Sequence, residues 1–225
     1  MTQKQLIELI QQHHPNMGET EIRLALNRAQ DDFSSKAESI KTTYVQSSVA
    51  GKRYYTLDGQ ILRVLRVQIN DVDIPRLITP PSIDDDEWGG ATGLTAPSSS
   101  TNDRYWYIDS GRLGVVERVK NAITRDDKIS DFQSISEAKE MRIYALSQAA
   151  DFTTDLTEVS ELPSQFHDAL AFKVISEGYL RGTSATFNPQ ASQLFDAKYK
   201  ELIKDAKKEA RRNHTGSFTI KPIDF

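Results

Sequence analysis

The chain of 225 residues contains no cysteine. It therefore has no disulfide framework, no thiolate zinc site and no cysteine nucleophile. The absence of cysteine is compatible with a location in the cytoplasm. It also has no apolar run that approaches the length of a membrane span. Residues 1–14 show a helical rather than a continuous apolar pattern, so we expect neither a signal peptide nor a membrane partner.

Catalytic and cofactor motifs are equally scarce. The chain has no GxSxG, P-loop, GxGxxG or HExxH pattern. The acidic run at 84–87 lacks the spaced ligands and the turn glycine of a calcium loop, so we interpret it as solvated loop charge. The histidines are expected in surface or capping roles: His13, His14, His167 and His214. We therefore predict no catalytic residue, no cofactor, no metal site and no enzymatic activity.

The overall charge is acidic, with a formal net charge of -4 and an isoelectric point near 5.6. This argues against a dedicated nucleic-acid binder, whose field would be net basic. One local basic run does occur, in residues 198–212. Interleaved carboxylates and the dipole of a helix C-terminus account for it better than specific DNA reading does. Contacts with passing DNA or a partner remain open for these residues: Lys204, Lys207, Lys208, Arg211 and Arg212.

Two helices are expected at the N-terminus. Leu6, Leu9 and Ile10 form a short apolar stripe that ends before Pro15, because proline disfavours helical backbone at the residue before it. After Gly18, apolar residues recur at helical spacing as far as 33, with carboxylates in the first turn.

From residue 42 the pattern changes to β-branched and aromatic residues. We expect a hairpin within 44–57, then a long strand at 61–69 that turns at Asn70-Asp71 and returns at 72–78. A second hairpin should surround Asp109-Ser110-Gly111. Residues 141–150 could form a strand or a short helix, and we prefer a strand that closes the sheet. Residues 80–103 are rich in Gly, Ser, Pro and Asp and predict a protruding loop.

The last third predicts two helices and an arm. Pro163 suits an early helical position of a helix that ends by Gly182, and Asn188 suits an N-cap with Pro189 in the first turn. The following tail is too apolar for a solvating end, so we expect it to pack on a partner. Its anchors are Phe218, Ile220, Ile223 and Phe225.

The predicted fold class is α+β. A helical bundle from the N- and C-terminal segments would carry an inserted antiparallel β domain and an extended C-terminal arm. The segments we expect are 1–41 for the N-terminal helices, 42–150 for the β domain with a long loop at 79–103, 151–212 for the C-terminal helices and 213–225 for the arm.

This order of elements resembles the head-to-tail adaptor (connector) proteins of tailed bacteriophages. The resemblance rests on the N-terminal helices followed by VAGKRYYTLDGQILRVLRVQINDVDIPRLI, RYWYIDSGRLGVVE, ELPSQFHDALAFKVISEGYLR and NPQASQLFDAKYKELIKDAK. In that family, a strand pair and a tyrosine-containing hairpin precede a helix opened by Leu-Pro, a second helix and a C-terminal extension.

The resemblance implies a structural subunit of the virion neck, assembled in the host cytoplasm. Such subunits form a ring, commonly a dodecamer, that binds the portal protein above and a tail protein below. The ring leaves a channel through which double-stranded DNA passes without sequence readout. The arm from Thr215 would dock on the portal or on an adjacent subunit.

Two other functions compete with this one. A DNA-binding packaging factor would use the N-terminal helices and the basic last helix, and salt-dependent DNA binding by the monomer would favour it. A hydrolase would require a site assembled from scattered residues. A cluster of converging carboxylates with strongly shifted pKa values would favour this function.

Overall fold

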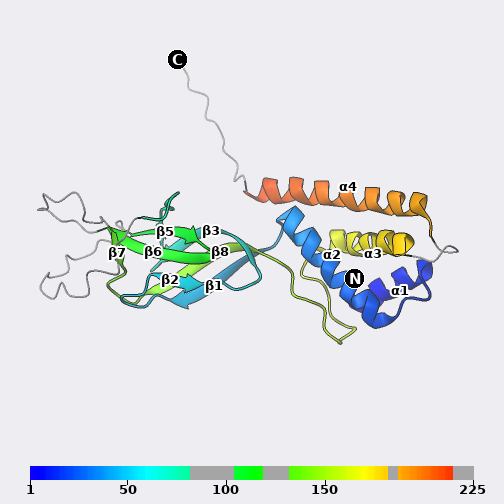
Figure 1. Ribbon diagram of the computed structural model, residues 1–225, viewed down its shortest axis with the longest axis horizontal. Coiled ribbons are helices and arrows are strands. Elements are labelled where there is room, and N and C mark those ends of the chain that lie inside the picture. Colours follow the sequence, from blue (N-terminus) through cyan, green and yellow to red (C-terminus); the bar gives the residue numbers. More distant parts are fainter. Residues whose placement is uncertain (82–103, 119–131, 182–186, 215–225) are drawn as a thin grey trace, which may run out of the picture. The chain divides into compact units, whose positions relative to one another are not determined.

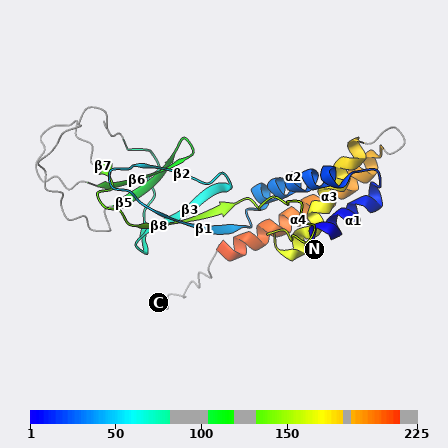
Figure 2. The same ribbon diagram turned by 90° about the horizontal axis from the view of Figure 1, so that it is seen from below.

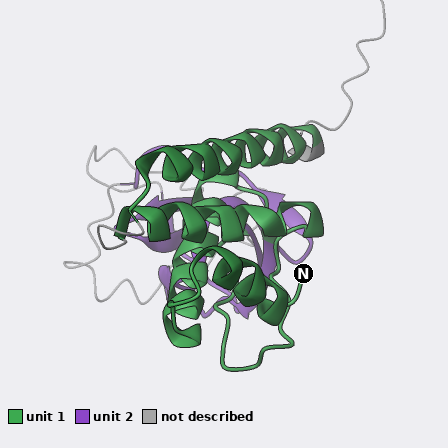
Figure 3. Cartoon of the chain, turned by 90° about the vertical axis from the view of Figure 1, so that its right-hand side faces the viewer, with its two compact units in different colours: residues 1–41, 146–225 green, residues 42–145 purple. Residues whose placement is uncertain are grey.

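The computed structural model describes residues 1–81, 104–118, 132–181 and 187–214, with side chains as far as Arg212. The chain divides into two compact units (Figures 1 and 3). A helical unit contains Met1–Lys41 and the chain from Leu146 onward, and a β unit contains Thr42–Ala145. With four helices and antiparallel sheets, the protein belongs to the predicted α+β class.

The two N-terminal helices of the helical unit are confirmed. Helix α1 (Gln3–His13) begins with a capping box in which the Thr2 hydroxyl accepts from the Gln5 amide and the Gln5 side chain accepts from the Thr2 amide. Helix α2 (Glu19–Ala37) carries Glu19 and Glu21 in its first turn, where carboxylates complement the helix dipole. It ends at Glu38, which takes a left-handed conformation.

The two C-terminal helices are also confirmed, although the first begins four residues after Pro163. A short 3-10 turn, η2 (Ser164–Phe166), follows Pro163 and leads into α3 (His167–Arg181). Helix α4 (Pro189–His214) is capped by the Asn188 side chain, which accepts from the Ala191 amide at 3.0 Å. In both Figures 1 and 2, α4 runs alongside α3.

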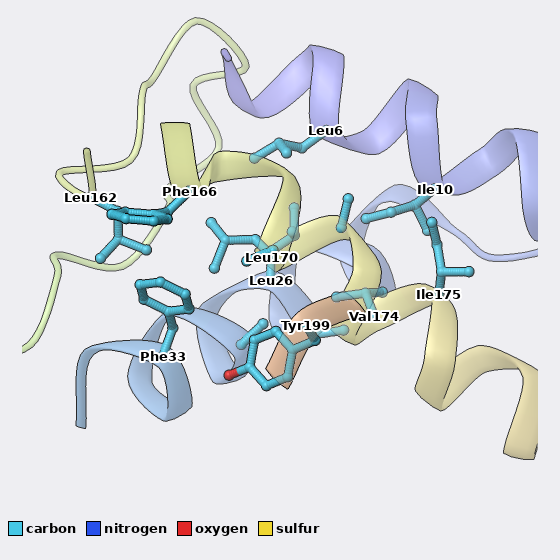
Figure 4. Packing of buried hydrophobic residues seen from close by; sticks show 14 of the residues in the cluster. Leu6, Ile10, Leu26, Phe33, Leu162, Phe166, Leu170, Val174, Ile175 and Tyr199 are labelled. Atoms are coloured by element: carbon cyan, nitrogen blue, oxygen red, sulfur yellow. The ribbon is translucent and has the colours of Figure 1, made fainter. Parts of the chain in front are cut away.

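One apolar core joins all four helices (Figure 4). Leu6 and Ile10 enter it from α1, Leu26 and Phe33 from α2, and Tyr199 from α4. These residues are at most 1% exposed. The spacing of four residues in α1 and seven in α2 places these side chains on one face of each helix, so burial of these faces holds the helices together.

The β unit consists of two antiparallel sheets that share a smaller core. One sheet has the order β1-β8-β3-β4, and the other has the order β2-β6-β5 with β7 also paired to β6. The strands are β1 (Lys41–Ser47), β2 (Tyr54–Thr56), β3 (Ile61–Ile69), β4 (Val72–Ile74), β5 (Arg104–Asp109), β6 (Arg112–Arg118), β7 (Phe132–Ser134) and β8 (Glu140–Ser147). Buried residues of both sheets, among them Val67 from β3 and Val115 from β6, meet in this core.

Two predicted hairpins are confirmed and one is wrong. β3 pairs with β4 through Asn70 and Asp71, both at positive φ, and β5 pairs with β6 through Ser110 and Gly111, also both at positive φ. The return strand β4 ends before Pro75, earlier than the expected 78. No hairpin joins β1 and β2, because β1 pairs with β8 and β2 pairs with β6. The predicted strand at 141–150 is β8, which ends at Ser147.

A buried ion pair lies in the second sheet. Arg104 of β5 and Glu117 of β6 are paired residues, with Arg104 Nε 3.6 Å from Glu117 Oε2. Their side chains are 0% and 2% exposed. Gln133 of β7 donates to the second carboxylate oxygen at 2.8 Å.

Candidate functional site

Of the two sets of candidate contact residues predicted from the sequence, the cations of residues 204–212 lie within the described part of the chain, on helix α4. Its buried positions Ser192, Tyr199, Ile203 and Ala206 recur at helical spacing and form one stripe against the helical core. The opposite face carries exposed charged residues. A helix of this length, 26 residues, extends about 39 Å at 1.5 Å per residue, so α4 presents a long, straight row of side chains.

Tyr199 fixes α4 to α2. Its hydroxyl donates to Asp32 Oδ2 at 2.7 Å, and Lys36 Nζ lies 2.7 Å from the same oxygen. Burial acts to raise the pKa of Asp32, but the hydrogen bonds from Lys36 and Tyr199 outweigh it and hold that pKa below its usual value. Burial, followed by the hydrogen bond to Asp32, raises the pKa of Tyr199. The phenol therefore stays protonated and remains a donor.

Further contacts fix α4 to η2, α3 and α1. The Ser176 hydroxyl donates to the Ser192 carbonyl at 3.0 Å, and the two buried hydroxyls lie 3.1 Å apart. Near the other end, Gln165 donates to Glu209. The Phe195 ring of α4 stacks on Tyr179 of α3 and meets His13 of α1 edge-on. Helix α4 is thus fastened along its length.

The five predicted cations of α4 are all exposed on this fixed helix: Lys204, Lys207, Lys208, Arg211 and Arg212. Lys208 pairs with Asp205 at 2.9 Å, and Lys200, about two turns earlier, pairs with Asp196 at 2.6 Å, as expected for interleaved carboxylates. Within the described residues, Lys204 and Lys207 have no ion-pair partner. Such a row can meet phosphates electrostatically, but it has no geometry for reading bases.

Three histidines have described side chains, and all three make hydrogen bonds within the protein, while the side chain of His214 lies outside the described residues. Two of the three are more buried than the sequence indicates. His14 caps α1 and is 9% exposed, with its Nε2 donating to the Ile175 carbonyl at 3.0 Å. His167 is 1% exposed, and its Nε2 donates to the Leu162 carbonyl at 2.8 Å. His13 shares a hydrogen bond of 3.2 Å with the Tyr179 hydroxyl. In the described part of the chain, no three His, Asp or Glu side chains converge as metal ligands.

Two predicted features fall outside the described residues. The arm residues Phe218, Ile220, Ile223 and Phe225 lie beyond His214, and the acidic run at 84–87 lies in the gap between 81 and 104. Among the helices that are described, none is long and apolar enough to cross a membrane.

Sequence reasoning missed a surface on the β unit. A cavity of about 380 Å³ lies beside β1 and is lined from β1 to β8 by Tyr44, Val45, Gln46, Thr56, Leu57, Asp58, Ile61 and Ile143. It brings together segments almost a hundred residues apart in the sequence, which no local pattern could have indicated. The sequence shows the alternating pattern of β1, but it does not show that β1 is an edge strand of its sheet.

Comparison with known proteins gives one family. The family described as SU10 adaptor protein matches residues 1–221, nearly the whole chain. A search of curated proteins gives no match.

Proposed function

We propose that this chain, which belongs to the SU10 adaptor family of phage proteins, is the subunit of a ring that lies beneath the portal and joins the capsid to the tail. The observation that carries the proposal is the family match over residues 1–221, since it includes both compact units rather than one of them. The chain is therefore a phage adaptor protein and a virion component. The ring, commonly a dodecamer in such adaptors, and its place on the portal are the proposal.

The separate surfaces of the two units support a head-to-tail role. A ring built from heterologous contacts needs two different patches on each subunit, one for each neighbour. The helical unit offers the exposed face of α4, and the β unit offers the open side along β1. We propose a structural role without enzymatic activity; among the described residues, no three His, Asp or Glu side chains converge as metal ligands.

The cations of α4 support a channel for DNA. Lys204 and Lys207 are exposed and have no ion-pair partner within the described residues, so both are available to phosphates or to acidic groups of a partner. The carboxylates among them keep the row moderate in charge, which suits DNA that must pass rather than stay bound. We propose that α4 contacts passing double-stranded DNA without reading its sequence.

The arm is proposed as the joint of the assembly. Phe218, Ile220, Ile223 and Phe225 supply apolar anchors that can enter pockets of a portal or an adjacent subunit. Deletion of Ser217–Phe225 should leave the circular dichroism spectrum unchanged and weaken co-assembly with the portal in sedimentation. Unchanged co-assembly would contradict this role of the arm.

A DNA-binding test separates the adaptor from a packaging factor. The isolated monomer and a Lys204→Gln/Lys207→Gln variant are titrated with double-stranded DNA at low and at physiological salt. The adaptor predicts weak binding that physiological salt abolishes, with ring formation on the portal unaffected by the variant. Tight binding by the monomer at physiological salt would favour the packaging factor.

A further inference from the structure

Strand β1 has a backbone edge that no described strand covers. At its two ends, the Ser147 amide donates to the Ile40 carbonyl at 3.1 Å and the Ser48 amide donates to the Lys139 carbonyl at 2.7 Å. These bonds set β1 antiparallel to β8 with its even-numbered backbone groups directed at β8. The backbone groups of Thr43, Val45 and Ser47 therefore point to the opposite edge, where the described sheet ends.

The other edge of the same sheet is protected. Strand β4 has only three residues, contains Asp73 and is followed by Pro75. Short length, charge and proline are the features by which sheets avoid pairing with other chains. Strand β1 has seven residues, no proline, and Val45 at 61% exposure. The difference indicates that the β1 edge is built for a partner strand.

The cavity beside β1 contains a polar group that lacks its partner. The Gln46 amide nitrogen is buried, lines this cavity of about 380 Å³, and has no hydrogen-bond partner among the described residues. A buried donor without an acceptor costs stability, about 1–3 kcal/mol, and persists where a ligand supplies the acceptor. Tyr44, Leu57 and Ile61 form the apolar part of the same cavity and pack against the β core.

An extended peptide with one apolar face fits this arrangement. Its backbone would pair with Thr43, Val45 and Ser47, its apolar side chains would enter the cavity, and one of its carbonyls would accept from Gln46. The C-terminal segment of the chain has the matching pattern. In residues 217–221, Phe218 and Ile220 alternate with Thr219 and Lys221, and Pro222 then ends any ladder because it has no amide proton.

We infer that the β1 edge and its cavity bind residues 217–221 from a second copy of this chain. The added strand places Phe218 and Ile220 in the cavity and leaves Thr219 on the outer face, next to Val45. This inference rests on the proposed function only in requiring that copies lie side by side. It assigns the arm to a neighbouring adaptor subunit rather than to the portal.

Disulfide trapping in the full-length protein tests the inference without background, because the chain has no cysteine. One version carries Thr219→Cys. A second, tagged version carries Thr43→Cys, Val45→Cys or Ser47→Cys, on the outer face of the β1 edge. After mixing and mild oxidation, mass spectrometry should show a tagged–untagged disulfide for at least one of the three, about tenfold above a Val72→Cys control.

Val72 is a matched control, since it is a partly exposed valine on the protected edge strand of the same sheet. Cross-linking no stronger than this control for all three positions would overturn the inference. A chain carrying both Thr219→Cys and the best β1 position should link between copies. A disulfide formed only within one chain would also overturn it, because the occupant would then be the chain's own tail.

Gln46→Leu should affect the melting temperature and the yield of trapped disulfide differently. Removing the partnerless donor should leave the melting temperature of the separate subunits unchanged or raise it, while reducing the trapped disulfide about tenfold. A merely structural glutamine would lower both. Because neither experiment contains the portal, their failure leaves the portal-binding test untouched, and failure of that test leaves these results interpretable.

Discussion

The two units of this protein differ in the size of their apolar cores and in the backbone and side-chain groups that they leave without a partner. The helical unit buries a continuous apolar core fed by all four helices, and its buried histidines and Gln30 have hydrogen-bond partners. The β unit has a smaller core, contains the buried Arg104–Glu117 pair, and leaves both a strand edge and the Gln46 amide without partners in the described residues. The helical unit also has two buried oxygens without a partner in the described residues, Gln3 Oε1 and Ser39 Oγ, so what distinguishes the β unit is the uncovered strand edge beside Gln46.

The uncovered strand edge indicates which unit should make the lasting contact on assembly. The helical unit exposes charged side chains along α4 rather than an uncovered strand edge, so this face suits transient or electrostatic contacts. A unit with a partnerless buried donor and an uncovered edge gains hydrogen bonds on binding. We therefore expect the β unit to provide the permanent contact between copies.

The largest effect is expected from the buried ion pair of the β unit. Glu117→Ala should lower the free energy of unfolding by about 3–5 kcal/mol, because it leaves the buried Arg104 guanidinium without its carboxylate. Urea unfolding followed by tryptophan fluorescence measures this, since Trp106 is buried in the core of the β unit. Glu137→Ala is the control, since Glu137 pairs with Lys139 while 59% exposed, and it should change little. Equal effects would show that the buried pair contributes nothing special.

The helical core should respond nearly as strongly to a cavity. Leu170→Ala removes a side chain that is 0% exposed and should cost about 2–5 kcal/mol in urea unfolding followed by circular dichroism. Leu180 lies on the same helix at 55% exposure, and Leu180→Ala should cost less than about 0.5 kcal/mol. Similar losses for the two variants would mean that the helical unit is not closed around one core.

Two glycines test close packing, one in each unit. A Cβ at Gly178 would lie 2.6 Å from the His14 ring, and one at Gly114 would overlap the Tyr107 ring. Gly178→Ala and Gly114→Ala should each lower the free energy of unfolding by about 1–3 kcal/mol through overpacking. At Gly59 nothing lies within 4 Å, so Gly59→Ala should be nearly neutral in the same thermal and urea unfolding. If Gly178→Ala were also neutral, α1 and α3 would be less tightly packed than the structure shows.

The smallest effect is expected at the α2–α4 contact. Tyr199→Phe removes the hydrogen bond to the half-buried Asp32 and should cost about 1 kcal/mol at neutral pH. The pKa of Asp32 is lowered in the folded state, so its contribution is present above its unfolded pKa, about 3.9, and is lost as pH falls below that value. The difference between the variant and the parent should therefore shrink below about pH 4. A difference independent of pH would assign the cost to packing rather than to the carboxylate.

Much of the fold follows from local sequence. Proline at 15, the cap at Asn188 and the turn residues Asn70 and Ser110 mark element boundaries through backbone conformations that only a few residue types favour. The family resemblance is also confirmed by the match over residues 1–221. These features depend on residues that are close in the sequence.

What the sequence could not predict depends on distant residues. The expected hairpin within 44–57 is wrong because the partner of β1 is β8, almost a hundred residues later. The cavity at Gln46 and the burial of His14 and His167 likewise arise from contacts across the fold. A lone polar residue in an alternating strand gives no sign that its amide will lack an acceptor. The cations of α4 were predicted as a group, while the lack of partners at Lys204 and Lys207 needed the structure.

Electron microscopy of the full-length protein mixed with its portal tests the central claim most directly. The account predicts a closed ring of this chain on the tail-facing end of the portal, with density connecting each subunit to the β1 edge of its neighbour. Portal particles that carry no such ring, although this chain is present in large excess over the portal, would contradict it.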